Sequence, residues 1–568
     1  MRPATPTWSV LPAAPPEELA RFAPLPPLAA QVLLNRGLGE PAEAEDFLRP
    51  DYRRLADPFL MKGMDLATAR IARAVAEGEA ITIYGDFDAD GVTAATLLVQ
   101  ALQHMGGKVR PYIPHRVEEG YGLNTEAVER LAAEGTHLLI TVDCGISNAA
   151  EVAHAGALGM DVIVTDHHLP PPEIPPALAI LNPRQADCRY PFKRLAGVGI
   201  AFMLVRGLTK AGLPRHGLRG RDLLDLVALG TVADVSPLAG ENRILVAYGL
   251  EAIHQTERIG LRALMAAAGV RPERVGTGTI AFTLGPRLNA AGRLQHAISA
   301  YRLLQAGTPE EAATLAEELD RLNRERQDLT AAVLERARDR VLTLPDEQKI
   351  ILLADPDYPA GIVGLVASKL TEEFHRPALL VELGARQSRG SARSIGAFHI
   401  TEALHACADL LTRFGGHRVA AGFTVPNENL PALEARLANL AEEQLDEAAL
   451  TPILKLEAEA TLADLNWGLL RAVEQMAPFG VENPRPVFLC RQVKVARARA
   501  VGKEGGHLRL TVSDGPLSQD AIGFGLGSRA TECPVGSTID LACTLETNTW
   551  GGEERLDLHV RDLRPAGE

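Results

Sequence analysis

Residues 81–98 read ITIYGDFDADGVTAATLL, a β-rich apolar run that ends in three alternating aspartates, Asp86, Asp88 and Asp90, and continues into a helical pattern. Acidic groups close three further apolar runs in the same way, and we expect each to be a strand end: Asp143 after HLLITV, Asp166, His167 and His168 after DVIVT, and Asp234 after LVALGTVA. Hard divalent cations such as Mg²⁺ and Mn²⁺ bind carboxylate oxygens, and Mn²⁺ also accepts imidazole. The pattern therefore predicts a site for two metal ions.

Within this site Asp143 stands alone on a central strand, so we predict that it bridges the two ions. The remaining positions are assigned to Asp88, Asp90, His167 and Asp234, and Asp86 either binds the second ion or orients its ligands. His167 and His168 are adjacent, and past the strand end both can turn toward the cleft. The alternative for His168 and for Asp166 is contact with the substrate phosphate or with a ligand rather than with metal.

Two other interpretations of the first aspartate triplet stay open. Asp-x-Asp-x-Asp-Gly is how a calcium-binding EF-hand loop begins, but that loop needs a bidentate Glu at its twelfth position, where this chain has Leu97. It also needs a preceding helix, and AITIY is typical of a strand. A solvated acidic turn is the second alternative.

Composition limits the class of protein. The chain has 568 residues, 46% of them hydrophobic, which predicts roughly three or four globular domains. The net charge of −14 excludes a basic coat over the whole surface but leaves room for a local basic channel. The six cysteines show no CxxC pairing, the N-terminus shows no signal-peptide pattern, and no apolar run is long enough to span a membrane. We therefore expect a cytoplasmic protein that has reduced thiols and no membrane association.

The periodicity predicts an α/β protein of five segments. Residues 1–60 form a Pro- and Ala-rich extension that we expect to pack on the next domain. In residues 61–305 strand-like and helical runs alternate up to about 182, which predicts a parallel sheet covered by helices, and the pattern from about 196 to 300 is helical, with Asp234 at the end of DLLDLVALGTVAD. Residues 306–345 form a connecting helix and residues 346–450 a smaller α/β lobe. In residues 451–568 the apolar period changes to two, which predicts a small β-barrel such as an OB-fold.

Basic residues indicate a polyanionic substrate. Nine basic residues and one acidic residue lie between Arg184 and Arg221, and six basic residues and no acidic one lie between Arg485 and Lys503. Arginine suits bidentate phosphate contacts, which adds Arg116 and the group Arg287, Asn289 and Arg293 as candidates. The Gly-rich segments GSARSIG and FGGHRVAAG would let backbone amides approach an anion, as a phosphate-binding loop does.

The strings GDFDADG, VDCG, TDHH and VADVSPL resemble, in order, the motifs of the DHH phosphoesterase superfamily, and GSARS with FGGHRVAAG resembles its DHHA1 domain. GYGLN, LGPRLNAAGRL, RLNRERQ and PFGVENPRPVF are similar to strings of its single-strand-specific exonuclease branch. The resemblance makes residues 61–305 the DHH catalytic domain, residues 346–450 a substrate-binding DHHA1 domain and residues 451–568 a nucleic-acid-binding OB-fold. Two positions depart from the family: Tyr358 and Pro359 stand where many relatives have Trp-His, and Tyr84 stands where many have His.

That resemblance implies a Mn²⁺- or Mg²⁺-dependent exonuclease that degrades single-stranded DNA from the 5′ end to mononucleotides in recombination and repair. A single-strand-binding protein and a helicase are the implied partners. The family motifs place His168 at the scissile phosphate beside the catalytic Asp143. The substrate residues implied are Arg116, Arg287, Ser391, Arg393, Gly416 and His417. A nano-RNase or cyclic-dinucleotide phosphodiesterase of the same superfamily is the alternative enzyme, and a nucleic-acid-binding scaffold with an inactive site is the alternative from another class.

Overall fold

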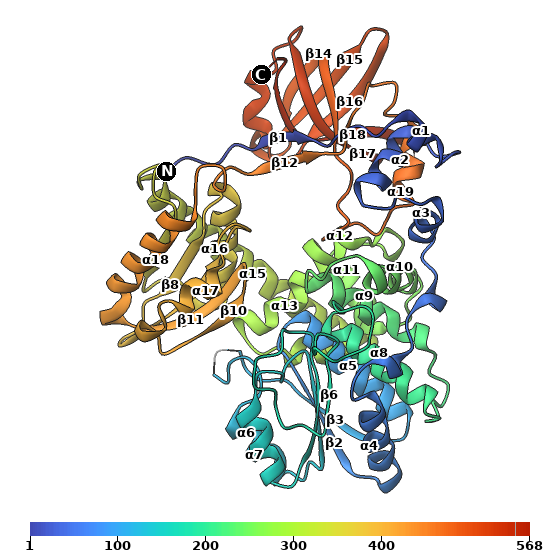
Figure 1. Ribbon diagram of the computed structural model, residues 1–568, viewed down its shortest axis with the longest axis vertical. Coiled ribbons are helices and arrows are strands. Elements are labelled where there is room, and N and C mark those ends of the chain that lie inside the picture. The colour runs from blue at the N-terminus through green and yellow to red at the C-terminus, as the bar shows by residue number, and fades with distance from the viewer. Residues whose placement is uncertain (117, 551–552, 568) are drawn as a thin grey trace. The chain divides into compact units, whose positions relative to one another are not determined.

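A five-stranded parallel sheet forms the centre of the first half of the chain in the computed structural model, which describes residues 1–116, 118–550 and 553–567 (Figure 1). The strand order is β3-β2-β4-β5-β6, and every neighbouring pair is parallel. The strands are β2 (Ala80–Gly85), β3 (Lys108–Tyr112), β4 (Leu138–Val142), β5 (Asp161–Thr165) and β6 (Ala179–Leu181). The predicted parallel sheet is confirmed, and its central strands are almost wholly buried, as near-continuous apolar runs require.

Helices cover both faces of this sheet and bury two separate cores. The face that presents Ile81 and Ile83 packs under α4 (Met64–Glu77), α5 (Ala89–His104) and α8 (Gly197–Lys210). The face that presents Leu139 and Val164 packs under α6 (Thr125–Ala133) and α7 (Ala149–Ala157). Figure 1 shows these two sets of helices on opposite sides of the strands. The carboxyl ends of the strands are thereby left as the accessible edge, where ligands bind in such sheets.

The segment that follows is helical, as predicted. Its main helices are α9 (Leu224–Ala233), α10 (Gly240–His254), α11 (Ile259–Ala267), α13 (Gly285–Leu294) and α14 (Ile298–Gln305). Asp234 is the residue that caps the carboxyl end of α9. Our expectation of a strand end at Asp234 is therefore wrong. An unbroken apolar run of this length occurs both in a buried strand and in a buried helix, and periodicity alone does not separate them.

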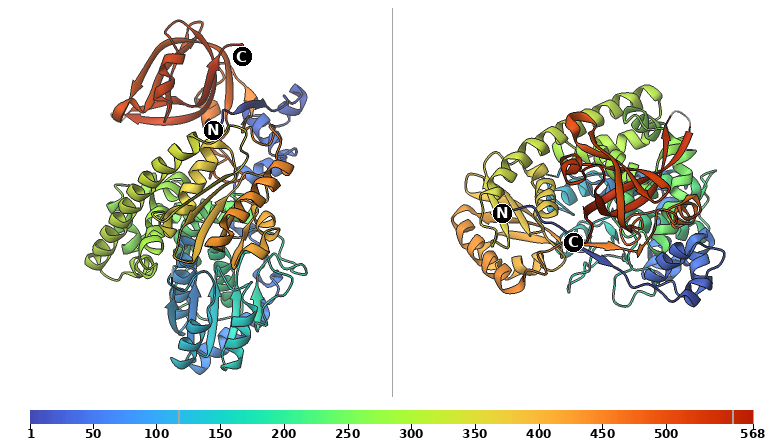
Figure 2. Two further views of the ribbon diagram at one scale, coloured as in Figure 1. Left: turned by 90° about the vertical axis from the view of Figure 1, so that its left-hand side faces the viewer. Right: turned by 90° about the horizontal axis from the view of Figure 1, so that it is seen from above.

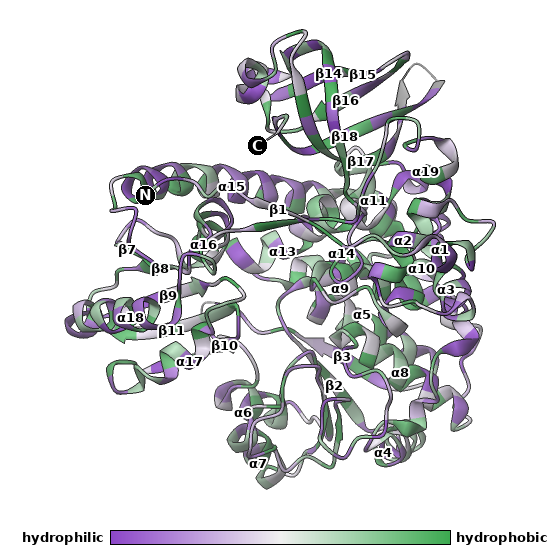
Figure 3. Ribbon diagram, turned by 45° about the horizontal axis from the view of Figure 1, so that its top comes forward, coloured by the Kyte–Doolittle hydropathy of each residue, from purple (hydrophilic) through white to green (hydrophobic). Residues whose placement is uncertain are grey.

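The predicted connecting helix is confirmed as α15 (Pro309–Leu342), a single helix of 34 residues. It begins where the Thr308 side chain accepts a hydrogen bond from the Glu311 amide, and proline occupies its first position. The exposed face of this helix is strongly hydrophilic (Figure 3), whereas residues such as Leu319 and Val333 are buried against the two lobes that it joins.

The smaller α/β lobe contains a five-stranded sheet of order β10-β11-β9-β8-β7. Its strands are β7 (Ile351–Asp355), β8 (Ala378–Glu382), β9 (Gln387–Arg393), β10 (Arg413–His417) and β11 (Ala420–Pro426), and its helices are α16 (Ala360–Phe374), α17 (Ile400–His405) and α18 (Leu430–Gln444). The two Gly-rich segments lie largely on β9 and on the β10–β11 hairpin rather than in phosphate-binding loops, which corrects that expectation. Only β7 and β8 pair in parallel among the described strands of this sheet.

The C-terminal segment forms the predicted barrel (Figure 2). Its five main strands are β14 (Phe488–Val501), β15 (His507–Asp514), β16 (Leu517–Gly523), β17 (Thr538–Trp550) and β18 (Glu553–Pro565). They follow the order β14-β15-β16-β18-β17, and β17 pairs again with β14, so the sheet closes on itself. Hydrophobic and hydrophilic residues alternate along these strands (Figure 3), and Leu508, Leu510 and Val512 are buried inside as the period of two predicted.

The N-terminal extension is placed differently from our expectation. The chain forms two compact units, and Pro6–Asp51 belongs with Pro452–Phe479 and the residues from Asn483 onward. β1 (Thr7–Val10) pairs with β12 (Ile453–Leu456), and residues of α2 (Pro27–Asn35) share a core with the barrel and with α19 (Trp467–Glu474). Pro6–Asp51 therefore shares its core with the barrel, whereas Leu55 of the predicted extension lies in the core of the parallel-sheet domain. The division into five domains stays a prediction.

Two further features bear on the sequence-based expectations. All six cysteines lie in the described part of the chain, where each is buried and carries a free thiol. Among the described helices, none combines the length and the apolar character that crossing a membrane requires.

The different burial of two leucines in the first unit allows a direct test of which side chains form the core. Leu97 on α5 is fully buried, so Leu97→Ala should lower the free energy of unfolding by about 2–5 kcal/mol. Leu66 on α4 is 54% exposed, so Leu66→Ala should change it by less than about 0.5 kcal/mol. Urea denaturation followed by circular dichroism measures both, and equal losses in the two variants would contradict the assigned core.

Candidate metal centre and substrate cleft

The first aspartate triplet occupies the junction between β2 and α5. Asp88 is the N-cap of α5, and its Oδ1 accepts hydrogen bonds from the amides of Asp90 at 2.9 Å and Gly91 at 3.1 Å. Asp86 precedes it at the end of the strand and is buried. Because a strand precedes the triplet and a helix starts at Ala89, the calcium-loop alternative is wrong.

The start of α8 positions two more carboxylates. The amides of Gly197 and Val198 donate to the two oxygens of Asp90 at 2.7 Å and 2.8 Å. Asp143, just past β4, adopts a left-handed backbone conformation with φ 62°. A Cβ atom at Gly197 would lie only 2.8 Å from Cβ of Asp143, so the close approach of α8 requires glycine there. One helix start thus holds Asp90 and leaves room for Asp143.

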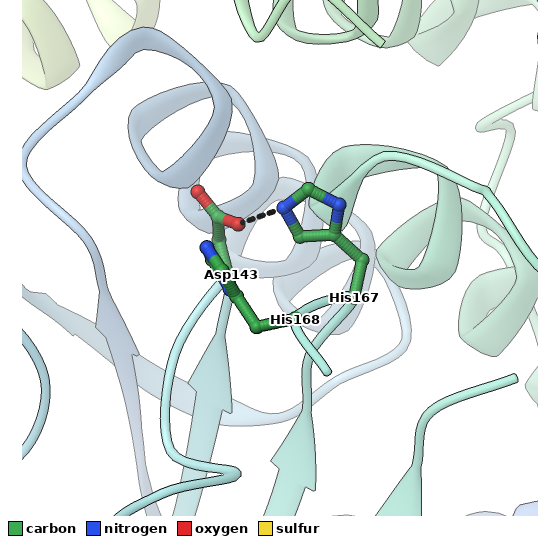
Figure 4. Close-up of side chains that lie close together, drawn as sticks. All are labelled: Asp143, His167 and His168. Carbon is green, nitrogen blue, oxygen red and sulfur yellow. Dashed lines mark ion pairs between the residues drawn. The ribbon is translucent and has the colours of Figure 1, made fainter. Parts of the chain in front are cut away.

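His167 completes this arrangement from the end of β5. Its Nε2 lies 3.0 Å from Oδ1 of Asp143 (Figure 4), and its Nδ1 lies 4.0 Å from Oδ2 of Asp234. Ser236 donates a hydrogen bond to the same Asp234 oxygen at 2.6 Å. The described residues form three sets whose ligand atoms all lie within 4.8 Å of one another: Asp86, Asp88 and Asp143; Asp90, His167 and Asp234; and Asp143, His167 and His168. All six predicted metal ligands therefore converge.

The electrostatics of this cluster are unfavourable without a cation. Burial and the charge of Asp234 raise the pKa of Asp90 to about 7, and burial with the charge of Asp88 raises the pKa of Asp234 to about 7. The pKa values of Asp86 and Asp143 are raised further above the usual range, first by burial and then by neighbouring carboxylates.

Several atoms of the cluster that could bind a metal ion also lack a hydrogen-bond partner. Among the described residues, Oδ1 of Asp86, Oδ1 of Asp143 and Nε2 of His167 are buried and complete no hydrogen bond. Buried polar atoms without a partner are rare in folded proteins. The donor set of carboxylates and one imidazole fits Mg²⁺ or Mn²⁺, and a cation bound there would neutralise the repulsion.

His168 has surroundings different from those of His167. Its Nδ1 lies 2.7 Å from Oδ1 of the buried Asp166, whose Oδ2 accepts from the Ile146 amide. The hydroxyl of Tyr121 lies 3.1 Å from the same Nδ1, and the ring of His417 stacks on the His168 ring at a centroid distance of 5.3 Å. Burial lowers the pKa of His168, but the hydrogen bond and charge of Asp166 outweigh it and raise that pKa to about 9. His168 is therefore protonated near neutral pH.

A cleft of about 730 Å³ opens beside the cluster, between the parallel-sheet lobe and the smaller α/β lobe. Its lining includes the predicted substrate residues Arg116, Ser391, Arg393, Gly416 and His417 together with His168. Arg116 lies over the ring of Phe87 at 4.7 Å. The cleft therefore joins a cationic wall to the acidic cluster.

Arg293 lies at the junction of the two lobes. Burial and the charges of Arg116, Arg326 and Arg393 lower its pKa to about 9, and its Nη1 donates to the Gly361 carbonyl at 3.2 Å. A Cβ atom at Gly361 would lie 2.3 Å from the Arg293 carbonyl oxygen, so the contact requires glycine. Arginines that repel one another in this way form a preorganised site for an anion.

Arg293 and two further predicted substrate residues lie outside the lining of this cleft. Arg287 pairs with Asp320 of α15 through Nε at 3.0 Å and Nη2 at 2.9 Å. Asn289 accepts a hydrogen bond from the Ala89 amide at 2.8 Å and so supports the start of α5. Their contact with substrate stays a prediction. In the described structure Asn289 links α13 to the start of α5, and Arg287 links α13 to α15.

The basic stretches are also less continuous than the sequence indicated. Lys193 donates to the Cys188 carbonyl, Lys210 pairs with Asp57 and Arg219 pairs with Asp222, so the first stretch is distributed over several local contacts. On the barrel, Arg485 pairs with Glu474 and Glu546, and Arg491 pairs with Glu459. Arg497 and Arg499 are exposed on β14.

Sequence reasoning missed residues that the structure places at the site. Tyr121 contacts His168 and also donates to the Asp143 carbonyl at 3.3 Å. The sequence does show Tyr121 as an aromatic residue between two glycines in GYGLN, a pattern that could have marked it as a candidate. Gly197 and the cleft residue Arg413 had no signal of their own, because their roles depend on which segments meet in space.

Three protein-family models match the chain: the DHH family, N-terminal domain, over residues 80–231, the DHHA1 domain over residues 347–443, and the RecJ OB domain over residues 456–562. Together with the sheet edge and its acidic cluster, these matches define the class: a DHH-family protein that carries DHHA1 and OB domains. The predicted superfamily and fold class are confirmed.

Curated relatives narrow the class further. The chain is 38% identical to the single-stranded-DNA-specific exonuclease RecJ of Bacillus subtilis, over 94% of this chain and 68% of that protein. It is 37% identical to the RecJ of Dickeya dadantii, over 95% of this chain and 96% of that protein. The crystal structure of Thermus thermophilus RecJ in complex with Mn²⁺ matches with a TM-score of 0.85 at 34% identity, covering 99% of this chain and 80% of that one. The chain belongs to the RecJ family.

The contact between Asp166 and His168 leads to a prediction about the pKa of His168. Asp166→Asn removes the charge that holds the pKa of His168 at about 9, while burial, which lowers that pKa, remains. The pKa of His168 should therefore fall to about 6.5 or lower, as measured by NMR titration of the imidazole in the presence of chelator.

The sign of the accompanying stability change follows from the raised pKa. The interaction stabilises the folded protein fully below about pH 6.5, and this stabilisation is lost as the pH rises through about 9. Asp161→Asn, which alters the pairing with the buried Arg70 and with Arg73 at the other end of β5 from His168, is the matched control. An unchanged His168 titration in Asp166→Asn would contradict the assignment.

Proposed function

We propose that this protein is a metal-dependent exonuclease that hydrolyses phosphodiester bonds of single-stranded DNA in the 5′ to 3′ direction and releases 5′-mononucleotides. The observation that carries the proposal is the cluster of buried carboxylates and one imidazole, with unsatisfied donor atoms, beside a cleft lined by arginines. Membership of the RecJ family, whose curated members are named single-stranded-DNA-specific exonucleases, supports the same conclusion.

The metal ligands are proposed residue by residue. Two Mn²⁺ or Mg²⁺ ions would be held by Asp86, Asp88, Asp90, Asp143, His167 and Asp234. Asp143 is the proposed bridge because it belongs to two of the three sets of converging ligand atoms. Mn²⁺ and Mg²⁺ complexes of Thermus thermophilus RecJ support this choice of ions. When bound, such a pair supplies an activated water and stabilises charge on the phosphate oxygens.

The residues around the ligands have separate tasks. Asp166 keeps His168 protonated, so His168 would donate a hydrogen bond to an oxygen of the scissile phosphate. Tyr121 orients the same imidazole. Asp90 is held by the amides at the start of α8, which fixes its carboxylate before any ion binds.

The cationic wall of the cleft would set the direction of degradation. Arg116, Arg393 and Ser391 line the same cleft as His168, and Arg293 interacts electrostatically with the two arginines. A terminal 5′ phosphate bears more negative charge than an internal phosphodiester, so this wall favours a strand end over an internal position. We propose that Gly416 and His417 contact the same terminal nucleotide from β10.

The cellular setting follows from this activity. A single-strand exonuclease acting in DNA recombination and repair meets strands that a helicase has separated and that a single-strand-binding protein covers, so we propose both as partners. We propose that it works in the cytoplasm, a reducing compartment in which its six free cysteines would stay reduced.

A time course on single strands labelled at either end tests the function. With Mn²⁺ or Mg²⁺, a 5′-labelled strand should release labelled mononucleotide at once, whereas a 3′-labelled strand should shorten progressively, and chelator should stop both. Blunt duplex DNA of the same sequence is the control and should persist. Consumption of dinucleotides alone would favour the dinucleotide phosphodiesterase alternative.

Removal of the proposed bridging ligand tests the metal centre. Asp143→Ala should slow hydrolysis by more than about 100-fold, because the loss of even an outer-shell partner of a metal site costs about 10- to 100-fold. Binding to a single strand, measured by fluorescence anisotropy, should remain detectable because the arginines of the cleft are intact. Asp65→Ala, an exposed aspartate on α4, is the control. Turnover like that of the wild type in Asp143→Ala would remove Asp143 from the site.

A further inference from the structure

The loop between β3 and α6 supplies two side chains to the cleft. Its described residues, 113–116 and 118–124, belong to neither a helix nor a strand, and Arg116 and Tyr121 among them line the cleft. The Arg116 guanidinium reaches the cleft over the ring of Phe87. Loops are more mobile than the elements they connect, so the position of Arg116 depends on the contacts that fix this loop.

Glu119 closes the turn on which Arg116 lies. Its Oε1 accepts a hydrogen bond from the His115 amide at 2.9 Å, and its own amide donates to the His115 carbonyl at 2.9 Å. Arg116 directly follows His115 in the chain. Both the side chain and the main chain of Glu119 therefore bind the residue from which Arg116 projects.

The second carboxylate oxygen of Glu119 ties the turn to both ends of the loop. Oε2 accepts hydrogen bonds from the hydroxyl of Tyr112, the last residue of β3, and from Nδ2 of Asn124, the N-cap of α6, the latter at 3.2 Å. Nη2 of Arg130 on α6 lies 3.6 Å from the same oxygen. The Glu119 side chain is 22% exposed, and Glu119 is absent from the described residues that line the cleft.

These contacts require the charged form of the carboxylate. Burial raises the pKa of Glu119, but the hydrogen bonds from Tyr112, His115 and Asn124 and the charge of Arg130 outweigh it and lower that pKa below its usual range. Glu119 is therefore ionised near neutral pH and can only accept hydrogen bonds. Hydrogen bonds to an ionised group are roughly twice as strong as neutral ones, so this single side chain contributes strongly to the closed turn.

The part of the loop that carries Tyr121 has anchors of its own. The Tyr84 hydroxyl donates to the Gly122 carbonyl at 2.9 Å, and the side chain of Asn148 forms two hydrogen bonds with the Leu123 backbone, at 3.1 Å and 3.3 Å. These contacts do not involve the carboxylate. Its loss should therefore loosen the turn that carries the arginine more than the segment around Tyr121.

We propose that Glu119 is a positioning residue for the selection of phosphorylated strand ends: by closing its turn it holds Arg116 where the guanidinium meets the terminal 5′ phosphate. This inference rests on the proposed function, in which Arg116 belongs to the cationic wall, and adds to it a residue that does not itself touch the strand. A displacement of about 1 Å by a change far from the reacting atoms can cost about 100-fold in rate, so a positioning residue has a measurable effect.

A comparison of two strand ends tests this role in the full-length protein with Mn²⁺. The quantity measured is the ratio of kcat/KM for a 5′-phosphorylated single strand to kcat/KM for the same strand with a 5′ hydroxyl. Glu119→Ala should lower this ratio by about 10- to 100-fold, the range expected for the loss of a hydrogen bond to a charged group, and should do so by raising KM for the phosphorylated strand. A variant that only weakens the fold lowers both values alike and leaves the ratio unchanged.

Matched variants separate the contacts of Glu119 from its charge. Glu119→Gln keeps the shape of the side chain and an acceptor for the His115 amide, so it should lower the ratio less than Glu119→Ala does. Glu118→Ala removes the neighbouring glutamate, which is exposed, and should keep the ratio of the wild type. Thermal denaturation shows that each variant is folded, and Glu119→Gln decides the question if Glu119→Ala does not fold.

A double-mutant cycle tests whether Glu119 acts through Arg116. Arg116→Ala should lower the ratio by itself, because the contact to the terminal phosphate is lost. Adding Glu119→Ala to this variant should lower the ratio no further, since the effects of two residues that act as one unit are not additive.

Two outcomes would overturn the inference: a ratio like that of the wild type in the folded Glu119 variants, or a further loss when Glu119→Ala is added to Arg116→Ala. Neither affects the proposed function, which is tested separately by metal-dependent shortening of single strands by the wild type. A wild type that shortens single strands but does not distinguish the two ends would overturn the inference together with the proposed role of the cationic wall, and would leave the exonuclease activity standing.

Discussion

Mutual repulsion among carboxylates buried around one imidazole is the constraint on which the rest of the molecule depends. Asp90, Asp143 and Asp234 surround His167, and burial raises the pKa of each carboxyl group. Such a cluster destabilises the folded chain unless cations occupy it, so the surrounding fold must hold the side chains together against their charges. The large cores on both faces of the parallel sheet provide the rigid support for this.

Helix starts contribute the local part of that support. Asp88 caps α5, and the amides at the start of α8 bind Asp90, so two negative charges lie where unpaired amides and the positive end of a helix dipole favour them. Asp86 and Asp143 have no comparable donors for one oxygen each. Backbone amides thus position Asp88 and Asp90, which remain proposed metal ligands, whereas a bound ion would be the partner of the unsatisfied oxygens of Asp86 and Asp143.

The smaller α/β lobe supplies one side of the cleft beside the proposed metal site. β9 and β10 bring Arg393 and His417 to the cleft, where His417 stacks on His168. The proposed phosphate contacts Arg393 and His417 thus come from the smaller lobe, whereas the acidic cluster and Arg116 come from the parallel-sheet lobe, and α15 joins the two. The barrel belongs to the second compact unit, and in the proposed function it would add surface for the strand rather than chemistry.

The sequence by itself determined the parallel sheet, the connecting helix, the barrel and the set of six acidic and imidazole groups, because parallel strands share one edge and apolar runs that end in Asp86 or Asp143 place their carboxylates there. It misassigned Asp234, since a fully buried helix and a buried strand have the same apolar run, and it placed the Gly-rich segments in loops. Only the tertiary structure decided that α8 holds Asp90, that Arg287 pairs with Asp320 and that the N-terminal segment shares a core with the barrel. These contacts join segments far apart in the chain, and local pattern carries no information about which segments meet.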